Sequence, residues 1–95
     1  MKAGALARER HVVAEHAFAE IVVWHVPHPV RGSTHLFKYS LALIVHGECV
    51  LRYDNETGKG DHRHVGVDET AYVFSGYEQL LADFWADVDS WRQQQ

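Results

Sequence analysis

Residues 34–55 read THLFKYSLALIVHGECVLRYDN and decide the fold. Two mostly apolar runs flank the dipeptide His46-Gly47, and such runs around a short turn are typical of a β-hairpin. The dipeptide suits the turn because glycine adopts positive φ freely and histidine tolerates it better than most residues. The sequence therefore predicts an antiparallel hairpin with these pairs: Val45 with Glu48, Leu43 with Val50, Leu41 with Arg52, and Tyr39 with Asp54.

This register sorts the side chains of the hairpin onto two faces, since successive residues of a strand point to opposite sides. It places Arg52 and Asp54 on the same face as Leu41, and it places Leu51 and Tyr53 on the other face. Both faces are apolar near the turn and polar at the far end. The chain continues from this polar end into residues 56–64, ETGKGDHRH. We expect the pairing to place these side chains beside that segment: Lys38, Tyr39, Arg52, Tyr53, Asp54 and Asn55.

A second hairpin is predicted on the N-terminal side. Residues 10–26 read RHVVAEHAFAEIVVWHV, which indicates two strands around a tight turn at residues 15–16. The predicted register pairs Val13 with Phe18. The two prolines, within residues 26–33, mark the connection to the next hairpin.

The last segment, residues 75–95, has the pattern of an amphipathic helix. Ser75 followed three positions later by Glu78 predicts a capping box at its start. Apolar side chains then recur at helical spacing and form one stripe: Tyr77, Leu80, Leu81, Phe84, Trp85, Val88 and Trp91. We therefore expect an α+β fold, in which an antiparallel sheet of four to five strands, built from two hairpins, carries a C-terminal helix on one face.

Composition narrows the class of protein. The formal net charge of −4 argues against a generally basic nucleic-acid binder, but residues 65–95 hold six acids against one base, whereas residues 1–64 hold all eight histidines. An anionic ligand should therefore prefer the N-terminal part. No apolar run is long enough to cross a bilayer, and the one cysteine cannot form an intrachain disulfide. We expect a cytoplasmic protein.

Residues 52–66, RYDNETGKGDHRHVG, concentrate charge and flexible backbone. Gly58 and Gly60 flank Lys59, and this composition lets backbone amides turn toward an anion while the lysine supplies charge. The spacing is not that of a Walker loop. A charged glycine loop at a sheet edge is also commonly no more than a soluble turn, and this interpretation stays open.

Two histidines follow the glycine loop. In an extended chain, His62 and His64 point to one side and Arg63 to the other. Two imidazoles near Lys59 and Arg52 are the groups needed to cleave RNA without a metal ion. One imidazole takes the 2′-hydroxyl proton, the other protonates the leaving 5′-oxygen, and a cation stabilises the phosphorane.

The sequence thus provides a set of candidate site residues, with no cofactor expected. The candidate catalytic residues are His62, His64, Lys59, Arg52 and Tyr53, of which Tyr53 offers a proton donor or a stacking platform for a base. The candidate substrate-binding residues are Lys38, Asn55, Gly58, Gly60 and Arg63.

Two alternatives remain open at this point. The loop could bind RNA or a nucleotide without cutting it. A metal-dependent nuclease or nucleotidyltransferase could instead use Asp61, His62 and His64 as ligands, with Asp54 as a further carboxylate. Against a metal ion, the neighbouring Lys59 and Arg63 would repel a cation.

Three stretches resemble one known family. The segment CVLRYDNETGKGDHRH at residues 49–64 is preceded by AFAEIVVWHVPHPVRGSTHLFKYSLALI and followed by LLADFWADV. Together these stretches resemble the TumE family of small toxins in bacterial type II toxin–antitoxin systems, over roughly residues 6–91. The resemblance implies one TumE-like toxin domain over residues 1–95, paired with a helix-turn-helix antitoxin of the TumA type. With the chemistry above it predicts an endoribonuclease that inhibits growth, and it leaves homodimerisation open.

Overall fold

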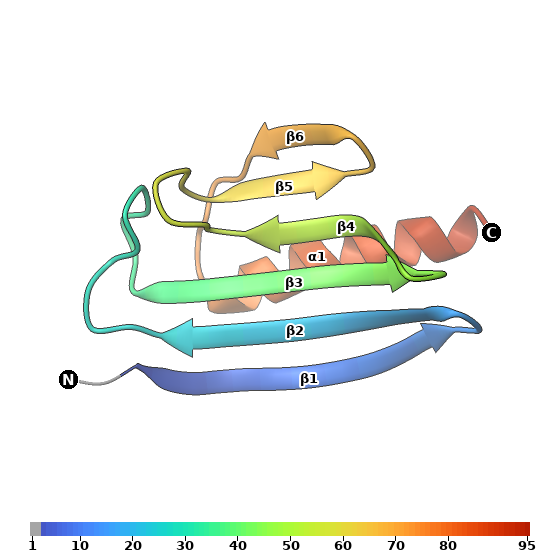
Figure 1. Cartoon of the computed structure of the whole chain (residues 1–95), viewed down its shortest axis with the longest axis horizontal. Coiled ribbons are helices and arrows are strands. Elements are labelled where there is room, and N and C mark those ends of the chain that lie inside the picture. The colour runs from blue at the N-terminus through green and yellow to red at the C-terminus, as the bar shows by residue number, and fades with distance from the viewer. Residues whose placement is uncertain (1–2) are drawn as a thin grey trace.

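The computed structural model describes residues 3–95 and contains one sheet and one helix (Figure 1). The elements in chain order are β1 (Gly4–Ala14), β2 (Ala17–His25), β3 (Phe37–Val45), β4 (Glu48–Asp54), β5 (His62–Val65), β6 (Asp68–Ala71) and α1 (Tyr77–Gln93). The six strands lie in the sheet in the same order as in the chain, and each neighbouring pair is antiparallel. The predicted α+β fold is therefore confirmed, but the expected four to five strands were too few.

The strand that the sequence did not reveal is β6. Its residues, Asp68–Ala71, are all exposed, so they carry no alternation of apolar and polar side chains. It follows β5 through a turn that contains Gly66, whose φ is 59°. β6 pairs along the whole of β5 and forms one edge of the sheet.

The hairpin of β3 and β4 begins as predicted, with Val45 opposite Glu48, and then slips by one residue. Cys49 pairs with Ile44, but Leu51 pairs with Leu43, so Val50 is an extra residue in a β-bulge. The bulge reverses the facing of every later residue of β4. The predicted pairs of Leu43, Leu41 and Tyr39 with β4 are therefore wrong.

The physical reason for the slip is burial. With the bulge, Leu51 and Tyr53 share a face with Leu41, and their exposed fractions fall to 4% and 3%. Arg52 and Asp54 move to the opposite face. The predicted faces of β4 were therefore reversed beyond the bulge.

The first hairpin has the same kind of irregularity. Ala14 pairs with Ala17 next to the turn, but Phe18 pairs with Val12 and not with Val13. His16 in the turn has a φ of 64°. The predicted position of the turn is confirmed, and the predicted register beyond it is wrong by one residue.

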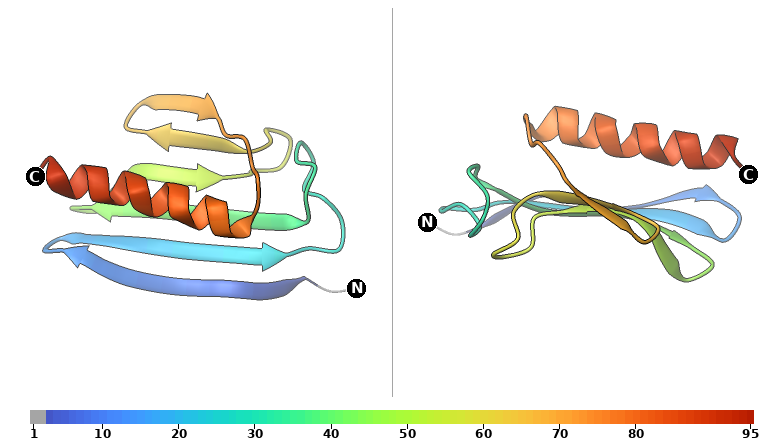
Figure 2. Two further views of the ribbon diagram at one scale, coloured as in Figure 1. Left: turned by 180° about the vertical axis from the view of Figure 1, so that it is seen from behind. Right: turned by 90° about the horizontal axis from the view of Figure 1, so that it is seen from above.

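The helix α1 lies across one face of the sheet (Figure 2). Leu80, Phe84 and Val88 are fully buried against apolar residues of β2, β3 and β4, which confirms the predicted stripe. The predicted capping box is wrong, because Gly76 occupies the N-cap and no side chain within residues 3–95 caps the helix. Among residues 3–95, no helix combines the length and apolar character needed to cross a membrane.

The sheet thus has two different faces. We call the face under α1 the covered face and the other one the open face. Residues paired across neighbouring strands share a face, so Arg52, Asp54, His62 and His64 lie together on the open face. Tyr53 and Arg63 lie on the covered face.

Candidate functional site

Three side chains meet on the open face where β4 and β5 pair. Asp54 lies opposite His62, and Arg52 lies opposite His64. The ring centroids of His62 and His64 are 4.7 Å apart, with the ring planes at 73°. One possible ligand atom from each of Asp54, His62 and His64 lies within 4.8 Å of the other two. We call these three residues the open-face cluster.

The two histidines of the cluster differ in exposure. The side chain of His62 is 5% exposed and that of His64 is 32% exposed. His62 Nδ1 lies 2.9 Å from the carbonyl oxygen of Gly60, and its Nε2 lies 2.7 Å from Asp54 Oδ1. His64 is therefore the imidazole that a large substrate can reach, and His62 lies beneath it.

Asp54 has an unusual environment for a carboxylate. Its Oδ1 is buried and has no hydrogen-bond partner among residues 3–95, although His62 Nε2 is close by. The two atoms are near each other, but the imidazole does not direct a hydrogen bond at this oxygen. The other oxygen, Oδ2, lies 4.0 Å from Arg52 Nη1.

A shallow pocket of about 270 Å³ gives access to the cluster. Arg52, Asp54 and His64 line it together with Cys49 and Gly66. Cys49 is a free, exposed cysteine. Ligands can therefore reach Asp54 and His64 from the solvent, with a guanidinium beside them.

Glu69 is the neighbour of the cluster that the sequence did not suggest. Its carboxylate lies 3.7 Å from His64 Nδ1 and 4.0 Å from His62 Nε2. It comes from β6, and that strand was not predicted. The glycine turn between residues 65 and 68 was the one signal that could have indicated it.

Tyr53 and Arg63 do not belong to the open-face cluster. Arg63 Nε donates to Asp87 Oδ2 at 2.7 Å and to the hydroxyl of Tyr53 at 3.1 Å. Burial, reinforced by a hydrogen bond to Asp87, raises the pKa of Tyr53 well above its usual value. Neither residue is therefore positioned for catalysis or substrate binding on the open face.

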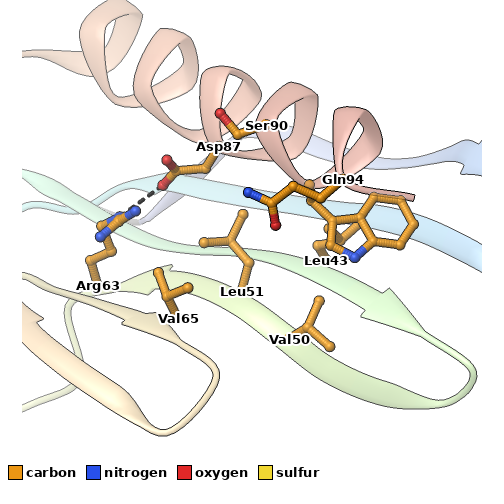
Figure 3. A pocket seen from close by; sticks show the side chains of 9 residues that line it. Leu43, Val50, Leu51, Arg63, Val65, Asp87, Ser90 and Gln94 are labelled. Carbon is orange, nitrogen blue, oxygen red and sulfur yellow. Dashed lines mark hydrogen bonds and ion pairs between the residues drawn. The ribbon is translucent and has the colours of Figure 1, made fainter.

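The pair of Arg63 and Asp87 borders a second pocket, of about 320 Å³, between α1 and the sheet (Figure 3). Its remaining lining is mainly apolar and includes Leu51, Val65 and Trp91. It opens on the covered face. The sheet therefore separates it from the open-face cluster.

Asn55 has a structural position. The residue is 1% exposed. Its side chain accepts a hydrogen bond from the amide of Tyr39 at 2.9 Å and donates to the carbonyl of Phe37 at 2.6 Å. The side chain thus pairs with the β3 backbone just beyond the end of β4. Packing thus accounts for Asn55, and almost none of the residue is exposed to a substrate.

The glycine loop packs against another loop. The amide of Gly58 donates to the carbonyl of Arg31 at 2.6 Å, so it does not face an anion. Gly60 is buried, and its φ is 77°. Lys59 is exposed, and Lys38 is exposed on the open face, two residues before Ser40, the partner of Asp54. Among the substrate-binding candidates, Lys38 has an exposed side chain that can contact a substrate on the open face.

Asp61 is bound by three side chains and not by the histidine pair. Its carboxylate accepts hydrogen bonds from Ser33 and Tyr39 at 2.7 Å and 2.6 Å, and it lies 2.7 Å from His35 Nε2. Burial acts to raise the pKa of Asp61, but these hydrogen bonds outweigh it and lower the pKa. In the metal alternative, Asp54 therefore takes the place that the sequence gave to Asp61.

The fold and the cluster together define a small α+β protein with a polar site on the uncovered face of a meander sheet. The family model described as Toxin TumE matches residues 3–92, which is nearly the whole chain, and the chain belongs to this family. No curated protein and no solved structure matches it.

Proposed function

We propose that the protein is the toxin of a type II toxin–antitoxin pair and that it inhibits growth by cutting RNA at the open-face cluster. Membership of the TumE family supports the toxin role. The observation that carries the RNA proposal is the position of His64. This imidazole is partly exposed, borders a pocket beside Arg52, and lies 4.7 Å from a second imidazole.

In this proposal the open face supplies the groups that phosphodiester cleavage needs. His64 takes the proton of the 2′-hydroxyl, the 2′-oxygen attacks phosphorus, and the 5′-oxygen leaves with a proton from solvent. Arg52 balances the charge that develops on the phosphorane. Lys38 and Lys59, both exposed, are available to hold flanking phosphates. His62 supports His64 from below.

A second candidate function is RNA or nucleotide binding without cleavage. The burial of His62 favours it, because a pair that acts as base and acid needs both imidazoles within reach of the substrate. Such a module would still inhibit growth by occupying its target. Its binding of RNA would depend on the pocket and on the cations Arg52, Lys38 and Lys59, but not on the imidazole of His64.

One experiment separates the two candidates. Purified protein is incubated with end-labelled RNA, and cleavage and binding are both measured, with and without chelator, for the wild type and His64→Ala. The variant His28→Ala serves as control, because His28 is an exposed residue of the β2–β3 connection. Cleavage that is lost in His64→Ala and kept in His28→Ala supports the ribonuclease. Binding without any cleavage by the wild type supports the module and refutes the ribonuclease.

A further inference from the structure

We propose that the open-face cluster of Asp54, His62 and His64 binds a divalent transition-metal ion, with Zn²⁺ as the first choice. The inference goes beyond the proposed ribonuclease, because it rests on local geometry and not on RNA cleavage. With an ion bound, the lone pair of His64 that the ion holds cannot accept a proton, so this imidazole would act as the base of the proposed cleavage only in the metal-free protein. The proposal is based on the environment of His62.

Both ring nitrogens of His62 face oxygen atoms. The carbonyl of Gly60, 2.9 Å from Nδ1, can only accept, so Nδ1 carries a proton. In a neutral imidazole, Nε2 then presents a lone pair, and Asp54 Oδ1 lies 2.7 Å from it. Two acceptors at this distance repel each other unless a proton or a cation lies near both.

The geometry favours the cation. A proton shared by the two atoms would make a hydrogen bond, yet Asp54 Oδ1 has no hydrogen-bond partner among the described residues and is shielded from solvent. The two atoms are close together but poorly aligned for a hydrogen bond, so a cation can take the place of a shared proton. Ligand atoms about 2.0–2.2 Å from a tetrahedral zinc ion lie roughly 3.3–3.6 Å from one another, so His62 Nε2 and Asp54 Oδ1, now 2.7 Å apart, would separate by about 0.6–0.9 Å to hold the ion.

The third ligand and the choice of metal follow from the surroundings. His64 brings a second imidazole to the same point, and the carboxylate of Glu69 lies within 4.0 Å of His62. Two imidazoles and one carboxylate form a known zinc ligand set that leaves a position open, and imidazole favours such metals over Mg²⁺ and Ca²⁺. The pocket beside Asp54 and His64 gives the ion a route to the site.

The charge argument against a metal does not hold in the folded chain. Arg63 points to the covered face and is ion-paired there, while Lys59 extends from the glycine loop with 57% of its side chain exposed. Within the part of the chain that the structure describes, the cation that remains beside the cluster is Arg52, 4.0 Å from Asp54. Two carboxylates, those of Asp54 and Glu69, outweigh its charge.

Binding is tested directly on the whole chain. Protein stripped with EDTA and transferred to metal-free buffer is titrated with ZnCl₂, MnCl₂ and MgCl₂ in a calorimeter, and the thermal unfolding midpoint is recorded. We expect one saturable Zn²⁺ equivalent and no response to Mg²⁺. At about a hundredfold excess over Kd, Zn²⁺ should raise the midpoint by roughly 10 to 20 °C. Absence of saturable Zn²⁺ binding would overturn the proposal.

Variants locate the ion. Asp54→Asn and His64→Ala should each weaken Zn²⁺ binding by at least about tenfold. His46→Asn is the matched control, because His16 and His46 form an exposed stacked pair with ring centroids 5.0 Å apart. Its affinity should equal that of the wild type. Zn²⁺ binding that follows His46 and not His64 would be adventitious surface binding and would refute the site.

The variant Asp54→Asn also gives a test without any metal. The asparagine amide can donate to the lone pair of His62 Nε2, so the stripped variant should unfold at a higher temperature than the stripped wild type. A lower midpoint would show that His62 is a protonated partner of Asp54, and it would contradict the argument for a cation. Neither measurement involves RNA, so a failure of the proposed ribonuclease would leave both outcomes readable.

Discussion

Gly32 and Gly60 touch through their backbones. A Cβ atom on Gly32 would lie 2.6 Å from the amide nitrogen of Gly60, and a Cβ on Gly60 would lie 2.7 Å from the carbonyl oxygen of Gly32. Because Cβ atoms do not approach backbone so closely, any side chain at either position would push the two loops apart. This contact fixes the start of β5, and with it the carbonyl that holds His62.

We therefore expect Gly60→Ala to lower the free energy of unfolding by about 3 kcal/mol, from positive φ and from the backbone clash together. The control is Gly58→Ala: Gly58 also has a positive φ, of 88°, but no atom of residues 3–95 outside its chain neighbours would lie within 4 Å of an added Cβ. That variant should lose only about 1–2 kcal/mol. Urea unfolding measures the loss of stability in both variants. Equal losses would show that the contact with Gly32 does not contribute to the free energy of unfolding.

Asn55→Ala should destabilise the fold by about 1–3 kcal/mol, because the amide of Tyr39 and the carbonyl of Phe37 lose a buried partner. The exposed Gln93 of α1, replaced by alanine, serves as the control. The measurement is again urea unfolding. A variant with unchanged stability and reduced RNA binding would instead place Asn55 in a substrate site.

The two histidines of the cluster should respond differently to alanine. His64→Ala should abolish growth arrest while the thermal unfolding midpoint stays within a few degrees of the wild type, since the side chain is partly exposed. His62→Ala should abolish growth arrest and also lower the midpoint, because it empties a buried position and leaves the carbonyl of Gly60 without its hydrogen-bond partner. Growth assays at matched expression, paired with thermal melts, check both. Full toxicity of His64→Ala would remove the proposed site.

Alkaline pH should destabilise the protein through the phenols of the buried Tyr53 and the half-buried Tyr72. Burial, with a hydrogen bond to an aspartate, raises the pKa of Tyr53 and of Tyr72 above the usual value of 10.0. Stability from a raised pKa is fully present below the unfolded value and is lost as pH rises beyond it. We expect the unfolding midpoint to fall above about pH 10. The fall should be smaller in Tyr53→Phe, and an equal fall would contradict this assignment.

The cognate antitoxin should protect the open face. Two acids of α1 are already engaged inside the protein, Asp83 by the hydroxyl of Tyr72 at 2.6 Å and Asp87 by Arg63 at 2.7 Å. The helix thus offers a basic partner fewer free carboxylates than its sequence suggests. Hydrogen exchange of the complex should show protection around Arg52 and His64. Protection confined to residues 78–92 would contradict this expectation.

The sequence predicted the elements better than their registers. Long apolar runs and the stripe of α1 are strong signals, and both hairpin turns were placed correctly. The bulges at Val13 and Val50 were not predictable, because both faces are apolar near each turn and no polar residue marks the slip. β6 is polar along its length and gives no periodic signal.

The same bulge explains where the candidate site residues lie differently from the predicted arrangement. Alternation correctly separates His62 and His64 from Arg63, since β5 is regular. It fails on β4, where the extra Val50 turns Tyr53 inward and brings Asp54 out beside His62. Asn55, Gly58 and Gly60 became candidates because of their residue types. In the structure, packing and backbone contacts explain why these residues stand at these positions.

The order of the strands also bears on how the protein is made. Each strand pairs with the one just before it, so the sheet can grow strand by strand as the chain leaves the ribosome. Its covered face has no cover until residues 77–93 emerge. Leu41, Leu43 and Tyr53 therefore remain exposed to solvent on the nascent chain. We expect the sheet that carries His62 and His64 to be unstable until α1 packs against it. We expect the toxin to become active only after α1 has been synthesised.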